Sequence, residues 1–216
     1  MAERVTFSGL RAEHVRGKLG RVRERIAAAG ADPANVRICA ATKYVPADEL
    51  PVLAEAGITL VGENRAQDLI AKQDAHGDLF EWDFIGALQS RKVKDVAPRV
   101  RLIQSLASES ALAQLERHPA RGVLVEVNVA GEGSKEGVEP DVLGDFIARC
   151  PVPVEGLMTM PPFTDRAEDS RRYFARLAEL AAEHGLRELS MGTTQDFEVA
   201  VAEGATIVRL GTVLYA

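Results

Sequence analysis

Eight short apolar runs, rich in β-branched residues, recur along the 216 residues of this chain. They lie at residues 36–41, 59–62, 82–85, 101–105, 123–129, 154–157, 188–191 and 206–210. The runs are continuous rather than alternating, which is typical of parallel strands covered by helices on one side and by side chains on the other. This repeat constrains the fold more than any other feature of the chain.

Segments with helical periodicity separate the runs. They lie at residues 47–56, 64–72, 90–96, 108–118, 141–149, 167–184 and 195–203, and one more precedes the first run at 10–29. Gly57 is a stop signal for the first of the seven, and Ser108 is a start signal for the fourth. Regular alternation of strand and helix predicts right-handed βαβ units and a parallel sheet.

Eight strands indicate closure into an α/β TIM-type (β/α)₈ barrel, here with an extra N-terminal helix. An open doubly wound sheet is the alternative. It usually has fewer strands and a glycine-rich fingerprint after the first one, whereas Thr42, Lys43 and Tyr44 follow the first run here. We therefore expect a single barrel domain spanning residues 1–216.

Composition and charge limit the kinds of molecule that this chain is expected to bind and the compartment in which it is expected. Apolar residues make up 46% of the chain and charged residues 27%, both ordinary for a globular protein. The net charge of −6 argues against a nucleic-acid surface. Cys39 and Cys150 are too few for a disulfide framework and lack metal-ligand spacing, so Cys39 is expected in the core. The start of the chain does not resemble a signal peptide, and no segment is long enough to cross a bilayer. A cytoplasmic location is expected.

In a barrel, functional residues gather at the carboxyl ends of the strands. Lys43 directly follows ICAAT, so we expect it at the mouth. A lysine there can form a Schiff base with an aldehyde. Position alone favours an ordinary solvated lysine, because lysines are rarely buried.

The loops after the seventh and eighth runs form the second candidate. They read SMGTT at residues 190–194 and RLGT at 209–212. Small residues let backbone N–H groups approach an anion, and Gln195 is expected to open a helix behind them. Either loop alone is an ordinary turn, but both at these two strands predict a phosphate site.

Two further segments are less specific. Asn64, after the second run, can contact a ligand in the mouth or cap the next helix, and the cap is favoured. The loop at 128–137 carries Lys135 among several glycines, which fits a mobile lid or a flexible surface loop.

Five segments then carry a family resemblance. They are ATKYVPADEL, VGENRAQD, FIGALQSRK, GLMTMPPF and SMGTTQDFEVAVAEGATIVRLGT, in order from residue 41 to residue 212. With them the chain resembles the pyridoxal-phosphate homeostasis protein family, whose barrel is similar to the N-terminal domain of alanine racemase. The resemblance implies a protein that holds pyridoxal 5′-phosphate (PLP), buffers its level and delivers it to PLP-dependent enzymes. It also implies a monomer without robust catalysis.

The resemblance also assigns roles. Lys43 would bind the cofactor aldehyde, Arg209 would lie near the pyridine nitrogen, and Asn64 would lie close to the ring. The phosphate ligands would be Ser190, Gly192, Thr194, Gly211 and Thr212, and Lys135 would help cofactor exchange from its loop. An arginine at the ring nitrogen disfavours protonation there, which makes the ring a weaker electron sink.

Some positions depart from the family pattern. Thr193 and Thr194 replace Met-Ser, although Thr194 keeps a hydroxyl, and Arg91 stands where an asparagine is frequent. The final VLYA also differs slightly from the usual aromatic–glycine end.

Two other functions remain open. A racemase of this barrel type needs a second base on the opposite face of the substrate, from a β-domain that we do not expect after Ala216. Tyr44 adjoins Lys43, but successive residues should point in different directions. The third possibility is a barrel for another phosphate ligand, with Lys43 incidental.

Overall fold

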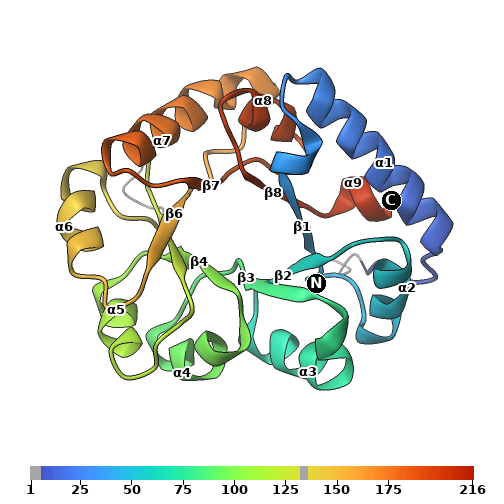
Figure 1. Ribbon diagram of the computed structural model, residues 1–216, viewed down its shortest axis with the longest axis horizontal. Coiled ribbons are helices and arrows are strands. Elements are labelled where there is room, and N and C mark those ends of the chain that lie inside the picture. The colour runs from blue at the N-terminus through green and yellow to red at the C-terminus, as the bar shows by residue number, and fades with distance from the viewer. Residues whose placement is uncertain (1–5, 132–135) are drawn as a thin grey trace.

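The structure, a computed structural model, describes residues 6–131 and 136–216. Eight parallel strands close into a barrel in chain order, with β1 paired to β8 (Figure 1). The strands are β1 (Arg37–Ala41), β2 (Leu60–Glu63), β3 (Glu81–Phe84), β4 (Leu102–Leu106), β5 (Val123–Glu126), β6 (Val154–Met158), β7 (Glu188–Ser190) and β8 (Ile207–Leu210). The predicted (β/α)₈ barrel is confirmed.

Helices form a ring outside the strands (Figure 1). They are α1 (Ala12–Ala28), α2 (Leu50–Glu55), α3 (Ala66–His76), α4 (Val93–Val96), α5 (Glu109–Leu115), α6 (Leu143–Ala148), α7 (Arg171–Glu183), α8 (Phe197–Ala202) and α9 (Thr212–Tyr215). Short 3₁₀ turns lie at Pro33–Asn35, Ala47–Glu49, Gly77–Leu79, Ser90–Lys92, Ala97–Arg99, Pro140–Val142 and Ala167–Ser170. Among the described helices, none is long and apolar enough to span a membrane.

The extra N-terminal helix is confirmed as α1. Its buried residues Val15, Leu19, Val22 and Ile26 recur every three or four positions, which places them on one face. Figure 1 shows α1 running beside α9 at the rim of the barrel, and the two helices are in contact.

Several predicted boundaries shift. The helices expected at 47–56, 90–96, 141–149 and 167–184 each open with a 3₁₀ turn before the α-helix begins. The strand expected at 123–129 ends at Glu126, and Val127 then forms an isolated bridge with Val138. Helix α9 was not predicted, because four residues carry too little periodicity to be recognised. Ser108 caps α5 as expected, accepting a hydrogen bond from the Ala111 amide at 3.2 Å.

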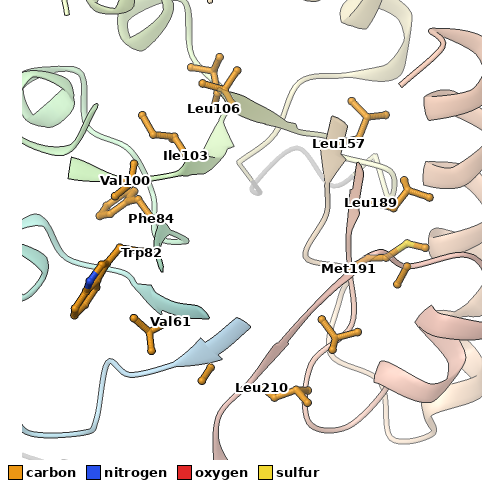
Figure 2. Close-up of a cluster of buried hydrophobic side chains, with 14 of the residues drawn as sticks. Val61, Trp82, Phe84, Val100, Ile103, Leu106, Leu157, Leu189, Met191 and Leu210 are labelled. Carbon is orange, nitrogen blue, oxygen red and sulfur yellow. The ribbon is translucent and has the colours of Figure 1, made fainter. Parts of the chain in front are cut away.

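Two apolar clusters lie on the two faces of the barrel wall. The larger one joins strand residues to helix residues, and Figure 2 shows members including Val61, Trp82, Ile103 and Leu157. The smaller one contains residues from strands only and fills the interior: Cys39, Leu60, Leu102, Leu124, Met158 and Ile207. Neighbouring residues such as Leu60 and Val61 belong to different clusters, as alternation along a strand requires.

Candidate ligand site at the carboxyl ends of the strands

Lys43 lies in a turn just beyond β1, where the Val45 amide donates to the Thr42 carbonyl at 2.8 Å. Its side chain is exposed, and its Nζ is 4.9 Å from the centroid of the Tyr44 ring. The expectation that Lys43 and Tyr44 diverge is therefore wrong. The strand ends at Ala41, so the alternation that holds within a strand does not extend to this turn.

A cavity of about 270 Å³ lies beside Lys43, and residues of the β1 and β2 ends line it together. Asn64 borders it, and the Asn64 Oδ1 atom is buried without a hydrogen-bond partner among the described residues. The prediction that Asn64 caps the next helix is wrong, because Arg65 holds the extended N-cap conformation and α3 starts at Ala66. A buried unpartnered acceptor at a cavity wall is suited to a ligand donor.

A buried ion pair supports the floor of this cavity. Lys72 on α3 reaches back to the barrel wall, where its Nζ lies 2.5 Å from Glu63 Oε1 and 2.7 Å from the Thr42 carbonyl oxygen. The Thr42 hydroxyl donates to the same Glu63 oxygen at 2.6 Å. Lys72 thus ties the end of β1, directly before Lys43, to the end of β2. Sequence reasoning missed this cluster, although a glutamate directly after an apolar run was a usable signal.

The loops after β7 and β8 lie side by side, as the predicted phosphate site requires. The Arg209 amide donates to the Gly192 carbonyl at 3.0 Å, and the Val213 amide donates to Thr194 Oγ1 at 3.4 Å. Gly192 has φ +90°, and a Cβ there would lie 2.6 Å from the Ala200 Cβ. Only glycine therefore lets helix α8 pack so closely on this loop.

The threonine that departs from the family pattern has a local partner. Asp196 Oδ1 accepts hydrogen bonds from the Thr193 amide at 2.7 Å and from the Thr193 hydroxyl at 3.1 Å. These bonds hold the loop, and α8 begins at Phe197, two residues later than predicted. The other main departure, Arg91, contacts Gln89 Oε1 through two nitrogens, each at 3.1 Å.

Ser190 and Arg209 meet inside the barrel. Arg209 is 6% exposed, and burial lowers the pKa of its guanidinium below the ordinary value. Its Nη1 donates to Ser190 Oγ at 2.5 Å and its Nη2 donates to the Thr159 carbonyl at 2.8 Å. Ser190 in turn donates to Gln104 Oε1 at 2.6 Å. A phosphate contact for Ser190 stays a prediction, but its only proton is already engaged in this structure.

The remaining predicted residues follow β8 or fall in the loop after β5. Gly211 directly follows β8, and Thr212 is the first residue of α9. Their phosphate contacts stay predictions. Lys135 lies outside the described residues, as do residues 132–134 of the predicted lid.

Glu126, at the end of β5, and Cys39 on β1 are two other titratable groups of this region. Burial raises the pKa of the Glu126 carboxyl, and the positive charge of Arg209 opposes that rise. Burial also raises the pKa of the Cys39 thiol, which is fully buried as the sequence predicted. Within the described part of the chain, no group of acidic, histidine or cysteine side chains could hold a metal ion.

Comparison with known proteins agrees with this architecture. The family described as "Alanine racemase, N-terminal domain" matches residues 19–216. A relative from Aquifex aeolicus named pyridoxal phosphate homeostasis protein is 41% identical over 218 residues, which cover 92% of this chain and 96% of the relative.

Solved structures extend the comparison. PipY of Synechococcus elongatus with PLP bound is 30% identical, with a TM-score of 0.80, and the match covers 94% of this chain and 100% of PipY. Alanine racemase from Corynebacterium glutamicum, at 15% identity and a TM-score of 0.71, shares the fold. That match covers 95% of this chain and 61% of the racemase. The chain therefore belongs to the pyridoxal phosphate homeostasis protein family, whose barrel is that of the alanine racemase N-terminal domain.

Proposed function

We propose that this protein binds pyridoxal 5′-phosphate at the carboxyl ends of its strands and serves PLP homeostasis in the cytoplasm, by buffering the cofactor and delivering it to PLP-dependent enzymes. The observation that carries the proposal is the similarity to PipY, which has PLP bound, across nearly the whole of both chains. Homologues with the homeostasis name support the same role.

The residues at the barrel mouth fit the cofactor. Lys43 offers an exposed primary amine beside a cavity, and Asn64 offers an unpartnered acceptor at the wall of that cavity. The loops after β7 and β8 bring together Gly192, Thr194 and Gly211, where phosphate is commonly bound in barrels of this kind. Arg209 supplies a buried cation on β8, the strand next to β1.

Each group has a distinct task. Lys43 would hold the cofactor through its primary amine, which can bond an aldehyde carbon with loss of one water molecule. The two loops would hold the phosphate, and Arg209 would lie at the ring nitrogen and oppose its protonation through its own positive charge. When bound, PLP supplies an electron sink, and this arrangement keeps that sink weak.

Exposure of Lys43 favours exchange over catalysis. A reactive carbanion needs a site closed to water, whereas a carrier must release its cofactor. A racemase also needs a second base on the face opposite the lysine. Tyr44 lies against Lys43 itself, with Nζ 4.9 Å from its ring, so it is placed on the same side as the lysine.

Absorbance spectroscopy, borohydride reduction and peptide mass mapping test the anchor. We expect a yellow protein whose reduced adduct maps to Lys43. Lys43→Ala is expected to fold but to lose covalent binding, while Lys94→Ala, on the exposed face of α4, is expected to bind as the wild type does. An adduct on any other lysine at wild-type occupancy would overturn the assignment of Lys43.

Racemase activity is the second candidate, favoured by the match to the alanine racemase N-terminal domain. Incubation of the loaded protein with L-alanine, followed by detection of D-alanine with D-amino-acid oxidase, distinguishes the two. We expect no D-alanine above the level of Lys43→Ala. A protein that takes up no PLP would instead favour a barrel for another phosphate ligand.

A further inference from the structure

A chain of hydrogen bonds crosses the barrel interior below the mouth. It begins with Arg101, whose Nη2 donates to Asp83 Oδ2. Gln104 Nε2 donates to the same oxygen at 2.6 Å, and Ser190 Oγ donates to Gln104 Oε1 at 2.6 Å. Arg209 Nη1 completes the chain by donating to Ser190 Oγ at 2.5 Å. The bonds join β3 and β4 to β7 and β8, which lie on opposite sides of the ring (Figure 1).

These groups are removed from water. Asp83, Gln104 and Ser190 are fully buried, and Arg209 is 6% exposed. In such surroundings a hydrogen bond is stronger than in water, and an unpaired polar group is costly. Burial raises the pKa of Asp83, while the Arg101 cation and the Gln104 amide oppose that rise.

The direction of every bond is determined by Asp83. Its Oδ2 accepts from Arg101, so Gln104 must turn its amide nitrogen towards Asp83 and its amide oxygen towards Ser190. The Ser190 hydroxyl has one proton, which that oxygen accepts. A lone pair of Ser190 is then left to accept from Arg209.

As a result, both Nη atoms of the Arg209 guanidinium are held by hydrogen bonds. Ser190 fixes Nη1, and the Thr159 carbonyl fixes Nη2 at 2.8 Å. Because the guanidinium is planar, two fixed nitrogens determine the plane of the whole group. A flipped Gln104 amide would offer a donor to Ser190 and would release the Ser190 proton from its present partner.

We propose that Gln104 and Asp83 are positioning residues, which act through Ser190 to set the plane of the Arg209 guanidinium against the ring nitrogen of PLP. This inference rests on the proposed function. It assigns Ser190 to the orientation of Arg209, and it gives a role to two polar side chains that otherwise lie unexplained within apolar strands.

The test uses the full-length protein loaded with PLP labelled with ¹⁵N at the ring. Two quantities are measured: the ¹⁵N chemical shift of the ring nitrogen and the dissociation constant for PLP. Gln104→Leu removes both bonds of the amide, and we expect a changed ¹⁵N shift and binding weaker by roughly three- to tenfold, the range for one lost hydrogen bond. Leu124→Val, an interior apolar change with no polar contact, is the matched control, expected to keep the wild-type shift.

A double variant separates positioning from simple loss of stability. In Asp83→Asn/Gln104→Glu the amide and the carboxylate exchange places. The asparagine nitrogen can donate to the new carboxylate, which still accepts from Ser190, so the bonds on the Arg209 side of residue 83 are restored, whereas the Arg101 bond to the atom that the nitrogen replaces is lost. We expect the double variant to recover the wild-type ¹⁵N shift, even if Gln104→Leu does not fold.

The outcomes are distinct. If Gln104→Leu keeps the wild-type shift and affinity while Arg209→Ala changes both, the positioning role is refuted and PLP binding stands. A double variant with the shift of Arg209→Ala refutes it equally. Wild-type protein that takes up no labelled PLP would refute the proposed function itself.

Discussion

Replacement of Lys72 by methionine tests the buried ion pair below the cavity. Methionine keeps most of the length of the lysine stem and removes the ammonium group, with its charge and its hydrogen bonds to Glu63 and to the Thr42 carbonyl. Without Lys72, the Glu63 carboxylate keeps the Thr42 hydroxyl at 2.6 Å as its hydrogen-bond donor among the described contacts, and its other oxygen is already unpartnered. The Glu63 side chain is 0% exposed and that of Lys72 is 9% exposed, so the carboxylate would be left in surroundings largely removed from bulk water.

Loss of one member of a buried ion pair costs about 3–5 kcal/mol, because a charge is left without compensation. We therefore expect Lys72→Met to lower the free energy of unfolding by that amount, a large share of the roughly 5–15 kcal/mol typical of a folded domain. Urea unfolding followed by the fluorescence of Trp82, the single tryptophan, measures the change.

A double-mutant cycle isolates the pair itself. Glu63→Gln/Lys72→Met removes both charges, so we expect it to cost less than the sum of the two single changes. Arg149→Met is the matched control. Arg149 binds Glu109 through two bonds, at 2.6 Å and 2.7 Å. The two side chains are 54% and 62% exposed. Because an ion pair so open to water contributes little, no measurable change is expected.

A free energy of unfolding for Lys72→Met within about 1 kcal/mol of the wild-type value, with an unchanged slope against urea concentration, would refute this role of the ion pair. Single changes that add within about 0.5 kcal/mol would refute it equally, because contacting charges must couple.

Three further predictions concern the loops and the barrel. Gly192→Ala should lower the free energy of unfolding by about 2–5 kcal/mol, because the left-handed backbone and overpacking both oppose the new side chain. Gly30→Ala is the control: Gly30 has φ +95° and no atom within 4 Å of a Cβ, so only the backbone contribution should be lost. Equal losses in the two variants would contradict the close packing of α8 on Gly192. Arg209→Ala should bind PLP more weakly with an altered absorbance spectrum, and unchanged values would refute its place beside the ring. Burial raises the pKa of the thiols of Cys39 and Cys150, which lowers the fraction of reactive thiolate at a given pH. At pH 8 we therefore expect Cys150 to react with a disulfide reagent more slowly in the folded protein than in urea, and Cys39 to react only on unfolding. Rapid labelling of Cys39 in the native protein would contradict its burial.

The barrel could be predicted from the sequence, and so could the edge at which the candidate site residues lie. Continuous apolar runs separated by helical segments specify parallel strands, and parallel strands bring their carboxyl ends to one edge. Lys43 and the loops at 190–194 and 209–212 therefore had to lie at the same mouth, wherever the helices began. Helix boundaries were less certain. The cap assigned to Asn64 was wrong by one residue, because extended backbone at Arg65 satisfies the same local pattern.

Hydrogen-bond partners that lie far apart in the chain could not be predicted from the sequence. Ser190 bonds to Gln104 across 86 positions, and Arg209 bonds to Thr159 across 50. A polar residue in an apolar run signals that a partner exists, but the identity of that partner depends on barrel closure and on the register of strands on opposite walls. Lys72 is a similar case, since only the packing of α3 brings it to Glu63.

By itself, the sequence determined which segments are strands, and that Lys43 and the loops of the candidate site lie at the same end of them, because these follow from local periodicity and chain direction. Only the tertiary structure decided that Ser190 turns inwards to Arg209, that Tyr44 packs against Lys43, and that Asp83 and Gln104 lie behind the site. These depend on distances across a closed barrel, where burial makes each polar side chain find a partner that no local pattern specifies.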